Sequence, residues 1–467
     1  MRTSSKPSLV PTWPQTLRLA LESAERSGVS VVVAVSRPLQ AGERTRLARV
    51  ARVFPQVGWA EVDREWLGLG AVDELITWDP TEVLAACDAV SDRLTQVHAD
   101  PETRAELRYF GGIAFDPTSP PHPAFPEGAP ARFVLPQILL HRDLTDPARS
   151  RATILLRAMP GESLDHLKDR FEEGFERVKL WQESARGIPE VALGARRVAD
   201  PEARSRWVGV IRSALAGIDE VQKVVLARQI PLTSSEPLDP WALMDRFDTS
   251  VPGYRFCFRF DEGASFVGAT PERLVWLEGR TAHVDCLAGT IARGATPEED
   301  AALAAQLLSS EKDRREQGFV VQAVREALEP LCEDLVVPEV PTIRKTPTVQ
   351  HLDSPVHGTL RAGVCLSDLL SVIYPTPAVC GVPREAARLA IRKLEERPRG
   401  WYAGAVGWVG SSGADFAVGI RSAILSPDGA IAFGGGGIVA GSDPEAEFEE
   451  TERKALSLIR LLEGWRT

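Results

Sequence analysis

The stretch Phe433-Gly-Gly-Gly-Gly-Ile-Val-Ala-Gly-Ser-Asp-Pro-Glu-Ala-Glu-Phe-Glu-Glu-Thr-Glu-Arg-Lys454 gives the first indication of how the chain is organised. Its four consecutive glycines, Gly434 to Gly437, carry no Cβ atom, so we expect a loop whose backbone amides can approach an anionic ligand. Asp443 followed by Pro444 is typical of the start of a helix. The sequence therefore predicts a glycine-rich loop that leads into a C-terminal helix.

Three charged side chains share one face of this expected helix. Glu447, Glu450 and Lys454 are spaced i, i+3 and i+7, which places them on the same side. Two carboxylates and one ammonium group beside an amide-rich loop could hold a divalent cation and a carboxylate substrate together. A solvated acidic helix after a flexible turn is the alternative that this stretch leaves open.

The composition limits the class of protein. The chain has 467 residues, 44% apolar and 25% charged, as is usual for a globular enzyme. A net charge of −11 and the lack of a concentrated basic run argue against a nucleic-acid partner. The six cysteines show no CxxC spacing, which is typical of a reduced cytosolic protein. We find no signal peptide and no apolar run of membrane-spanning length, so we expect a cytoplasmic protein without a membrane segment.

Short strands outnumber the helices between them and occur in runs, which favours an α+β fold with large mixed or antiparallel sheets packed together and helices on the outside. The composition loosens near residue 200, so we divide the chain into an N-terminal α+β region (1–200) packing on the core and a catalytic region (201–467). The expected helices are 17–27, 162–183, 201–218, 297–308, 311–331 and 383–396, with a final one after 443. Strands are expected at 29–35, 75–78, 108–115, 132–141, 152–158, 222–230, 254–260, 265–268, 273–277, 281–285 and 349–352, and within 401–409, 415–425 and 430–433.

Two residues are candidates for acid/base chemistry. Lys223 lies in the β-branched run Gln222-Lys-Val-Val-Leu-Ala-Arg228, where burial would lower its pKa towards that of a general base. A lysine that protects an edge strand is the alternative. Glu272 follows Pro271 in an expected turn between two strands. A carboxyl group facing a closed cleft would have a raised pKa and could donate a proton, whereas an exposed turn carboxylate would only be solvated.

A possible metal site combines carboxylates from two expected helices. Asp313 and Glu316 share one helix face, and Glu316 could complete a Mg²⁺ site begun by Glu450, because this ion commonly takes one or two carboxylates plus water and substrate oxygens. A solvated helix face is the alternative.

Three further segments could contact a ligand. Leu287-Ala-Gly-Thr290 offers backbone amides and a hydroxyl group. His351 lies in an expected strand, as a structural or a substrate-contacting residue. Arg421 stands among apolar strand residues and needs a carboxylate partner from the protein or a substrate. No P-loop, Rossmann, serine-triad or zinc signature is present, so the pattern suits Mg²⁺-assisted acid/base work on a polycarboxylate.

Together these motifs resemble the chorismate-utilising enzymes, which include isochorismate synthase, salicylate synthase and the large chains of anthranilate and aminodeoxychorismate synthases. The resemblance covers residues 201–467 strongly and extends more weakly to 108–115 and 133–140. It rests on segments that occur in the order of the family: 222–228, 268–273, 287–290, 310–314, 349–352, 375–379, 400–408, 420–423 and the closing glycine-rich stretch.

The resemblance implies the family's fold, with the active site in a central cleft, and a role for each candidate residue. Lys223 would activate a water that attacks C2 of chorismate, and Glu272 would protonate the departing C4 hydroxyl group. Glu316 and Glu450 would ligate Mg²⁺, with Glu447 and Asp313 close by. The groups expected to hold the carboxylates or line the site are Arg421, Lys454, the amides of Gly289, Gly435 and Gly437, and the side chains of Thr290 and His351.

Within the family, the chain is most similar to isochorismate synthases of the menaquinone type, which are isomerases. Lys223 favours water over ammonia as the nucleophile, so no glutaminase partner is expected. Salicylate synthases share this lysine and stay open, as do an amine-adding synthase, a siderophore pathway and a non-catalytic chorismate-binding protein. Gln317 and Tyr374 stand where many relatives have histidine, and both are candidates for positions behind the substrate-contacting residues.

Overall fold

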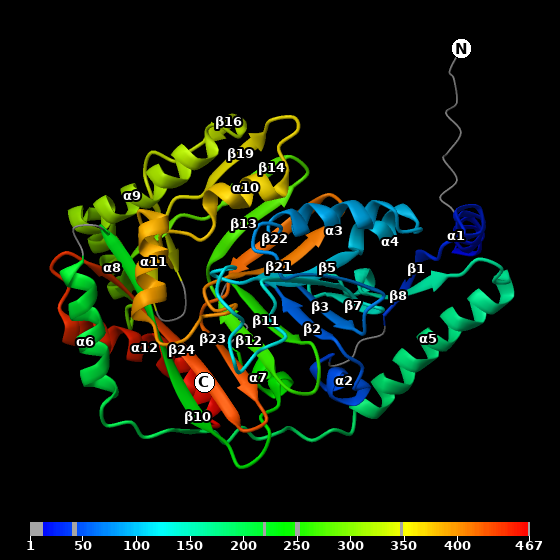
Figure 1. Cartoon of the computed structure of the whole chain (residues 1–467), viewed down its shortest axis with the longest axis horizontal. Helices are drawn as coiled ribbons and strands as arrows, with labels where there is room; N and C mark the ends of the chain where they lie inside the picture. Colours follow the sequence, from blue (N-terminus) through cyan, green and yellow to red (C-terminus); the bar gives the residue numbers. More distant parts are fainter. Residues whose placement is uncertain (1–12, 40–43, 218–220, 248–252, 346–348, 466–467) are drawn as a thin grey trace.

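The computed structural model describes residues 13–39, 44–217, 221–247, 253–345 and 349–465. Inside these ranges the side chains of Arg44, Thr290, Lys312, Glu316 and Phe319 lie outside the description. Two large antiparallel sheets and one small sheet, with helices on the outside, make up the described chain (Figure 1). The α+β fold expected from the sequence is confirmed.

The three sheets differ in size, and their strands follow one another in space in the orders below. The first, twelve-stranded sheet contains β1 (Val31–Pro38), β8 (Arg151–Ala158), β7 (Ile138–Asp143), β3 (Arg64–Leu69), β2 (Gln56–Ala60), β11 (Tyr254–Arg259), β12 (Ser265–Thr270), β23 (Ser422–Ser426), β24 (Gly429–Val439), β10 (Lys223–Thr233) and β20 (Gly381–Val382), with β9 (Arg196–Arg197) also paired to β10. The second, nine-stranded sheet contains β16 (Cys332–Val336), β19 (Val356–Leu360), β14 (Thr281–Val284), β13 (Arg273–Glu278), β22 (Gly413–Val418), β21 (Ala405–Gly410), β5 (Arg108–Ile113), β6 (Ala131–Leu135) and β4 (Asp73–Thr77). The third contains β15 (Leu287–Ala292), β18 (Val349–Asp353) and β17 (Thr342–Lys345).

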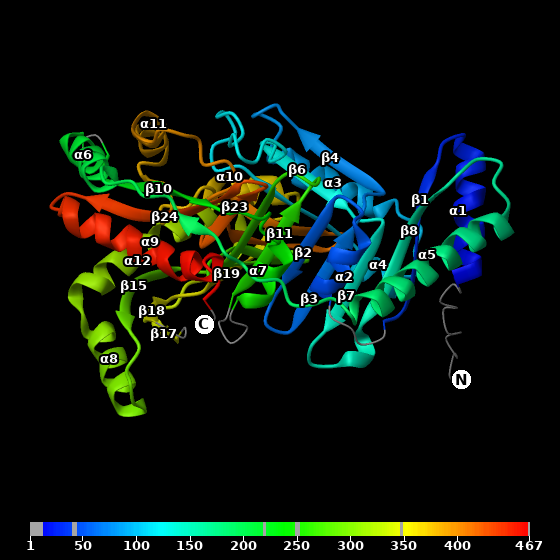
Figure 2. The same cartoon turned by 90° about the horizontal axis from the view of Figure 1, so that it is seen from below.

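The helices cover the outer faces and ends of these sheets. They are α1 (Trp13–Ser27), α2 (Arg44–Ala51), α3 (Ala85–Thr95), α4 (Pro101–Glu106), the 3-10 turn η1 (Pro147–Arg149), α5 (Leu164–Ala185), α6 (Ala203–Ala216), α7 (Pro240–Arg246), α8 (Pro297–Ser309), α9 (Glu311–Leu328), α10 (Leu366–Ile373), α11 (Arg384–Leu394) and α12 (Pro444–Leu462). Figure 1 shows α1 and α5 beside β1 and β8 at one end, and α11 and α12 beside β10 and β24 at the other. Figure 2 shows α8 projecting with the strands of the third sheet. No helix in the described ranges is both long and apolar enough to cross a bilayer.

Strands from both halves of the chain share each large sheet. In the first sheet β2 pairs with β11, and in the second β5 pairs with β21. An aromatic cluster packs where the two sheets face each other, with the Phe256 and Phe266 rings 5.4 Å apart and the Phe258 and Trp401 rings 5.3 Å apart. Burial of such large side chains is the main stabilising term of a core. The boundary expected at residue 200 stays a prediction.

Short segments carry the chain from one large sheet to the other, and at these points the expectation of single strands was wrong. Residues 132–141 divide into β6 and β7, and residues 415–425 divide into β22 and β23, with one strand of each pair in each sheet. Likewise β12 and β13 do not form the expected hairpin, because they belong to different sheets. The first break falls at Pro136, which cannot donate a ladder hydrogen bond, and the second at Arg421, whose φ is 52°.

Two of these crossings lie side by side. The amide of Ala269 donates to the carbonyl of Arg421 over 3.1 Å, and the amide of Val418 donates to the carbonyl of Glu272 over 3.0 Å. Glu272 and Arg421 are therefore brought together at the junction of the two sheets, although 148 positions separate them in the sequence.

The glycine run does not form the expected loop. Gly434 to Gly437 are part of β24, and Gly437 lies opposite Val225 of β10. The reason is the close packing of α12 on this strand: a Cβ atom at Gly434 would lie 2.5 Å from the carbonyl oxygen of Thr451. The helix start was predicted correctly, since α12 begins at Pro444 and the Asp443 side chain accepts from the Ala446 amide over 2.8 Å. All six cysteines are free, five of them buried.

Candidate active site

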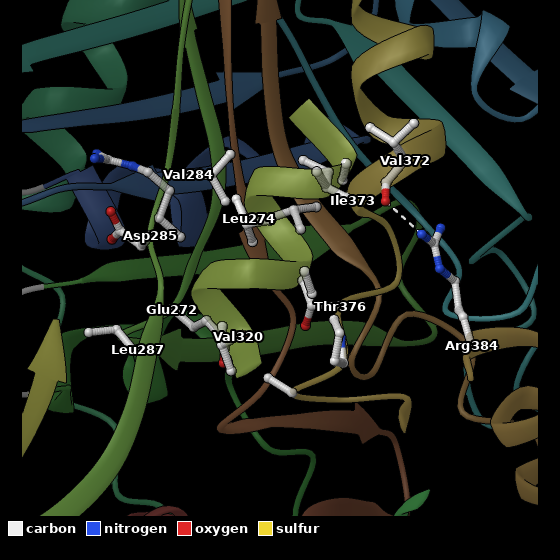
Figure 3. Close-up of a pocket in the computed structure, with 16 residues that line it drawn as sticks. Glu272, Leu274, Val284, Asp285, Leu287, Val320, Val372, Ile373, Thr376 and Arg384 are labelled. Atoms are coloured by element: carbon white, nitrogen blue, oxygen red, sulfur yellow. Dashed lines mark hydrogen bonds between the residues drawn. The ribbon is translucent and has the colours of Figure 1, made fainter. Parts of the chain in front are cut away.

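Glu272 lies at the crossing between β12 and β13 and lines a pocket. The pocket encloses about 730 Å³, including solvent at its mouth, and its walls come from β13, β14, β15, α9, α10 and the segment after α10. Figure 3 shows Glu272, Asp285 and Leu287 on one side and Val372, Ile373 and Thr376 on the other. The pocket therefore presents a carboxyl group to a largely aliphatic surface.

The environment of Glu272 suits a proton donor near neutral pH. Burial raises the pKa of its carboxyl group to about 7. The positive charges of Lys223 and Lys454 lower this pKa, whereas the negative charge of Asp285 raises it. A carboxyl group in this range is partly protonated at pH 7 and can act as a general acid.

Lys223 enters the same region from the first sheet. It is the first residue of β10, is half-buried, and lies opposite Val439 of β24 and Val382 of β20. Its side chain extends over the glycine strand, because a Cβ atom at Gly437 would lie 3.3 Å from Lys223 Cε. The glycine at position 437 thus leaves space for the lysine.

The expected charged face of α12 points to the same junction. Lys454 Nζ lies 2.5 Å from Glu450 Oε1, and both side chains are partly exposed. One oxygen of Glu447 accepts from Ser442 over 2.9 Å, while the other, Oε2, is buried without a hydrogen-bond partner among the described residues. Burial raises the pKa of Glu447, and the charge of Glu450 adds to this rise.

Arg421 joins the crossing to α12. Its Nη1 donates to the carbonyl oxygen of Lys454 over 2.5 Å. Burial lowers the pKa of the guanidinium group, and Tyr402 and Glu450 act in the opposite direction. The sequence required a carboxylate partner for Arg421, and Glu450 provides nearby negative charge while part of the guanidinium donor capacity goes to the backbone.

Tyr402 belongs to this site and was not selected from the sequence. Its ring stacks on Phe433 at 4.4 Å, and a Cβ atom at Gly435 would lie 3.0 Å from its hydroxyl oxygen. Burial raises its pKa to about 12, and Arg421 and Glu272 are among the charges that act on it. The signal was its place in segment 400–408, but an aromatic residue in a glycine-rich run carries no chemistry by itself.

The third sheet and α9 close another side of the region. Gly289 has φ of 64° at an irregularity in the β15–β18 ladder, and a Cβ atom there would lie 3.1 Å from Asp313 Cβ. The Gly289 carbonyl lies 3.3 Å from Nδ1 of His351. Burial lowers the pKa of His351, so the ring is neutral at pH 7. The side chains of Thr290 and Glu316, also selected from the sequence, lie outside the described atoms.

The two departures from the family pattern have structural explanations. Gln317 is buried and its Nε2 donates to the Cys286 carbonyl over 2.7 Å, which fastens α9 to the strand below it. The Tyr374 hydroxyl donates to the Ala114 carbonyl over 2.7 Å, which ties the end of α10 to the end of β5. Both side chains therefore act as structural supports of the pocket walls.

The charge pattern was compared with the needs of a divalent cation. No three His, Cys, Asp or Glu side chains converge in the described part of the chain, from which the Glu316 side chain is missing. The orphaned Oε2 of Glu447 and the raised pKa of that carboxyl group indicate negative charge that the described groups leave uncompensated. The oxygen-rich set on α12 fits a hard cation such as Mg²⁺.

Comparison with known proteins gives a consistent result. A family model described as chorismate binding enzyme matches residues 17–463. The chain is 36% identical over 364 residues to the salicylate biosynthesis isochorismate synthase of Pseudomonas aeruginosa, with 75% of each chain covered. It is 34% identical over 362 residues to the isochorismate synthase MenF of Bacillus subtilis, covering 76% of this chain and 75% of that one. The structure of MenF, the menaquinone-specific isochorismate synthase from Escherichia coli, matches with a TM-score of 0.74 and 28% identity over 96% of this chain and 100% of that chain.

Proposed function

The chain belongs to the family of chorismate-binding enzymes, and we propose that it is an isochorismate synthase that converts chorismate to isochorismate. The observation that carries this proposal is the Glu272 carboxyl group, whose pKa of about 7 and position in the pocket suit a general acid, with the Lys223 ammonium group close enough to act on that pKa. Acid and base at one site are what an exchange of hydroxyl groups requires.

In the proposed reaction the two groups act on different carbons of the ring. Lys223, in its neutral form, takes a proton from a water molecule as that water forms a bond to C2. Glu272 gives its proton to the C4 hydroxyl group, which leaves as water while the ring double bonds shift. One water enters and one leaves, so the substrate and product are isomers.

The other residues bind and orient the substrate. Chorismate carries two carboxylates, and Arg421, Lys454 and the amides of Gly289, Gly435 and Gly437 are proposed to hold them. Thr290, His351 and Tyr402 are proposed to line the site. Low exposure of Arg421 and His351 favours such a role, because charge–charge contacts strengthen where water is excluded.

A magnesium ion is proposed as the cofactor, held by Glu316 and Glu450 with Glu447 in support. When bound, Mg²⁺ would screen the repulsion between a dianionic substrate and these carboxylates. The buried, unpartnered Oε2 of Glu447 supports the proposal, since this oxygen needs a positive group or a donor.

We further propose a role in menaquinone synthesis, in the cytoplasm and without a glutaminase partner. The similarity to the menaquinone-specific enzyme favours this pathway, whereas the similarity to the Pseudomonas aeruginosa protein keeps salicylate production as the second candidate. Lys223 favours water as the nucleophile over ammonia.

Product analysis tests the proposal directly. Purified protein is incubated with chorismate and Mg²⁺, and the products are separated by chromatography, with Lys223→Ala and Glu272→Ala in parallel. We expect isochorismate from the wild type and a large loss from both variants. Salicylate with pyruvate would identify a salicylate synthase, product formed only with added ammonia would identify an amine-adding enzyme, and unchanged chorismate would contradict the proposal.

A further inference from the structure

Arg273, which follows Glu272 in the chain, is held by residues of both large sheets. Its Nε donates to the Tyr254 hydroxyl over 2.5 Å and lies 3.4 Å from Oδ1 of Asp415. Tyr254 belongs to β11 in the first sheet and Asp415 to β22 in the second. The Tyr254 hydroxyl in turn lies 3.1 Å from each Asp415 oxygen. We call these three residues the Arg273 cluster.

The Arg273 cluster is buried and electrostatically matched. Tyr254 and Asp415 are 5% and 3% exposed, and only the Arg273 side chain reaches the pocket, where 30% of it is exposed. A carboxylate so deeply buried requires a partner, and the guanidinium group supplies one. Glu61 adds a second negative charge nearby and is itself bonded to the indoles of Trp59 and Trp408 over 3.2 and 3.4 Å.

The backbone around Glu272 explains why this cluster bears on the pocket. The β13–β22 ladder shifts register between Arg273 and Val275, and such an irregularity changes the direction of the strand. The Glu272 carbonyl accepts from Val418, and its amide donates to the Thr270 hydroxyl over 3.3 Å. Because Glu272 is the last residue before β13, anchoring Arg273 fixes the point from which the Glu272 side chain leaves the sheet.

We propose that the Arg273 cluster positions Glu272 by tying the two sheets together at their crossing. The inference rests on the proposed function, in which Glu272 protonates the leaving hydroxyl group. Tyr254 and Asp415 act through Arg273 and do not line the pocket. They are positioning residues, and their loss should lower kcat more than it changes KM, because a displaced acid affects the chemical step rather than substrate binding.

The test replaces Tyr254 with phenylalanine, which removes the hydroxyl group and keeps the ring and the Arg273–Asp415 pair. Tyr109→Phe is the matched control: Tyr109 is also a buried tyrosine bonded to an aspartate, Asp73, which pairs with Arg93. It belongs to β5 of the second sheet and takes no part in the pocket. We expect Tyr254→Phe to lower kcat about tenfold with KM within about twofold, and Tyr109→Phe to leave both near the wild-type values.

A second variant, Arg273→Lys, keeps the positive charge beside Asp415 but loses the planar donor, so we expect a similar fall in kcat. Wild-type kcat in both Tyr254→Phe and Arg273→Lys would overturn the inference while leaving the proposed function intact, as would an equal loss in Tyr109→Phe. A wild-type protein that leaves chorismate unchanged would overturn the proposed function, and the positioning role with it. If Tyr254→Phe does not fold, the result for Arg273→Lys decides.

Discussion

Glu272 and Asp415 are two shielded carboxyl groups near the same sheet crossing, and both have a pKa raised to about 7 by burial. Asp415 is enclosed by Tyr254 and Arg273, which use its oxygens as acceptors. Glu272 faces a pocket, and the charges that act on it come from two lysines and Asp285. A raised pKa therefore does not distinguish a chemical group from a structural one, whereas access to open space does.

The largest expected effect separates the two groups by activity. Glu272→Gln removes the proton and keeps the size of the side chain, so we expect kcat to fall by about 10²- to 10⁴-fold, the usual contribution of a general acid. Steady-state kinetics with chorismate measure this. Glu278→Gln, an exposed position at the end of the same strand, is the control. A kcat for Glu272→Gln within a few fold of the wild type would remove Glu272 from the mechanism.

The second effect separates them by stability. Asp415→Ala leaves the Tyr254 hydroxyl and the Arg273 guanidinium without their shared acceptor, and we expect the free energy of unfolding to fall by about 3 kcal/mol. Urea denaturation followed by tryptophan fluorescence gives the value. Glu272→Gln should change it by less than about 1 kcal/mol, since no protein hydrogen bond to that carboxyl group is lost. Equal losses would show that both groups are structural.

The third effect tests the cation on the pocket side. Glu450→Gln should raise the Mg²⁺ concentration for half-maximal activity by about 10- to 100-fold, the range found when support for a metal is lost. It should also reduce the rise in melting temperature that Mg²⁺ produces in the substrate-free protein. Glu449→Gln provides the control, because Glu449 lies on the same helix but pairs with Arg204. Unchanged Mg²⁺ dependence in Glu450→Gln would rule out this ligand.

The smallest effect concerns pH. Glu272 must be protonated to act, so we expect kcat to fall about tenfold per pH unit above about 7. Stability responds to both carboxyl groups: the folded pKa values lie above the ordinary 4.5 and 3.8, the folded state binds more protons, and the free energy of unfolding falls as pH rises towards 7. Asp415→Asn should reduce that slope and keep the kinetic limb. A stability independent of pH between about 5 and 7 would contradict both assignments.

The sequence predicted the strands and the pocket residues better than it predicted their connections. Alternation identified β11, and the spacing on α12 placed Glu450 and Lys454 on one face. It did not show that 415–425 bends at Arg421, because a strand that changes sheets keeps the same apolar composition on both sides. The glycine run was assigned to a loop because the tight contact with Thr451 that requires glycine is a tertiary feature.

The same limit applies to the groups that support the site. Tyr254 and Asp415 are 161 positions apart, and nothing in either local segment indicates a partner. Tyr402 is similar, since its role depends on Arg421 and Gly435 from other strands. Lys223 and Glu272 were selected because each is chemically unusual in its own segment, which is a signal that a single sequence does contain.

The sharing of each large sheet by both halves of the chain also affects how the protein is made. Ala60 of β2 pairs with Arg255 of β11, 195 positions later. At about 5 to 20 residues per second, a ribosome needs about 10 to 40 s to synthesise that span. During this time β2 presents an unpaired strand edge, which is prone to association with other chains. The arrangement that brings both sheets to one active site therefore delays the folding of the N-terminal half until most of the chain has been translated.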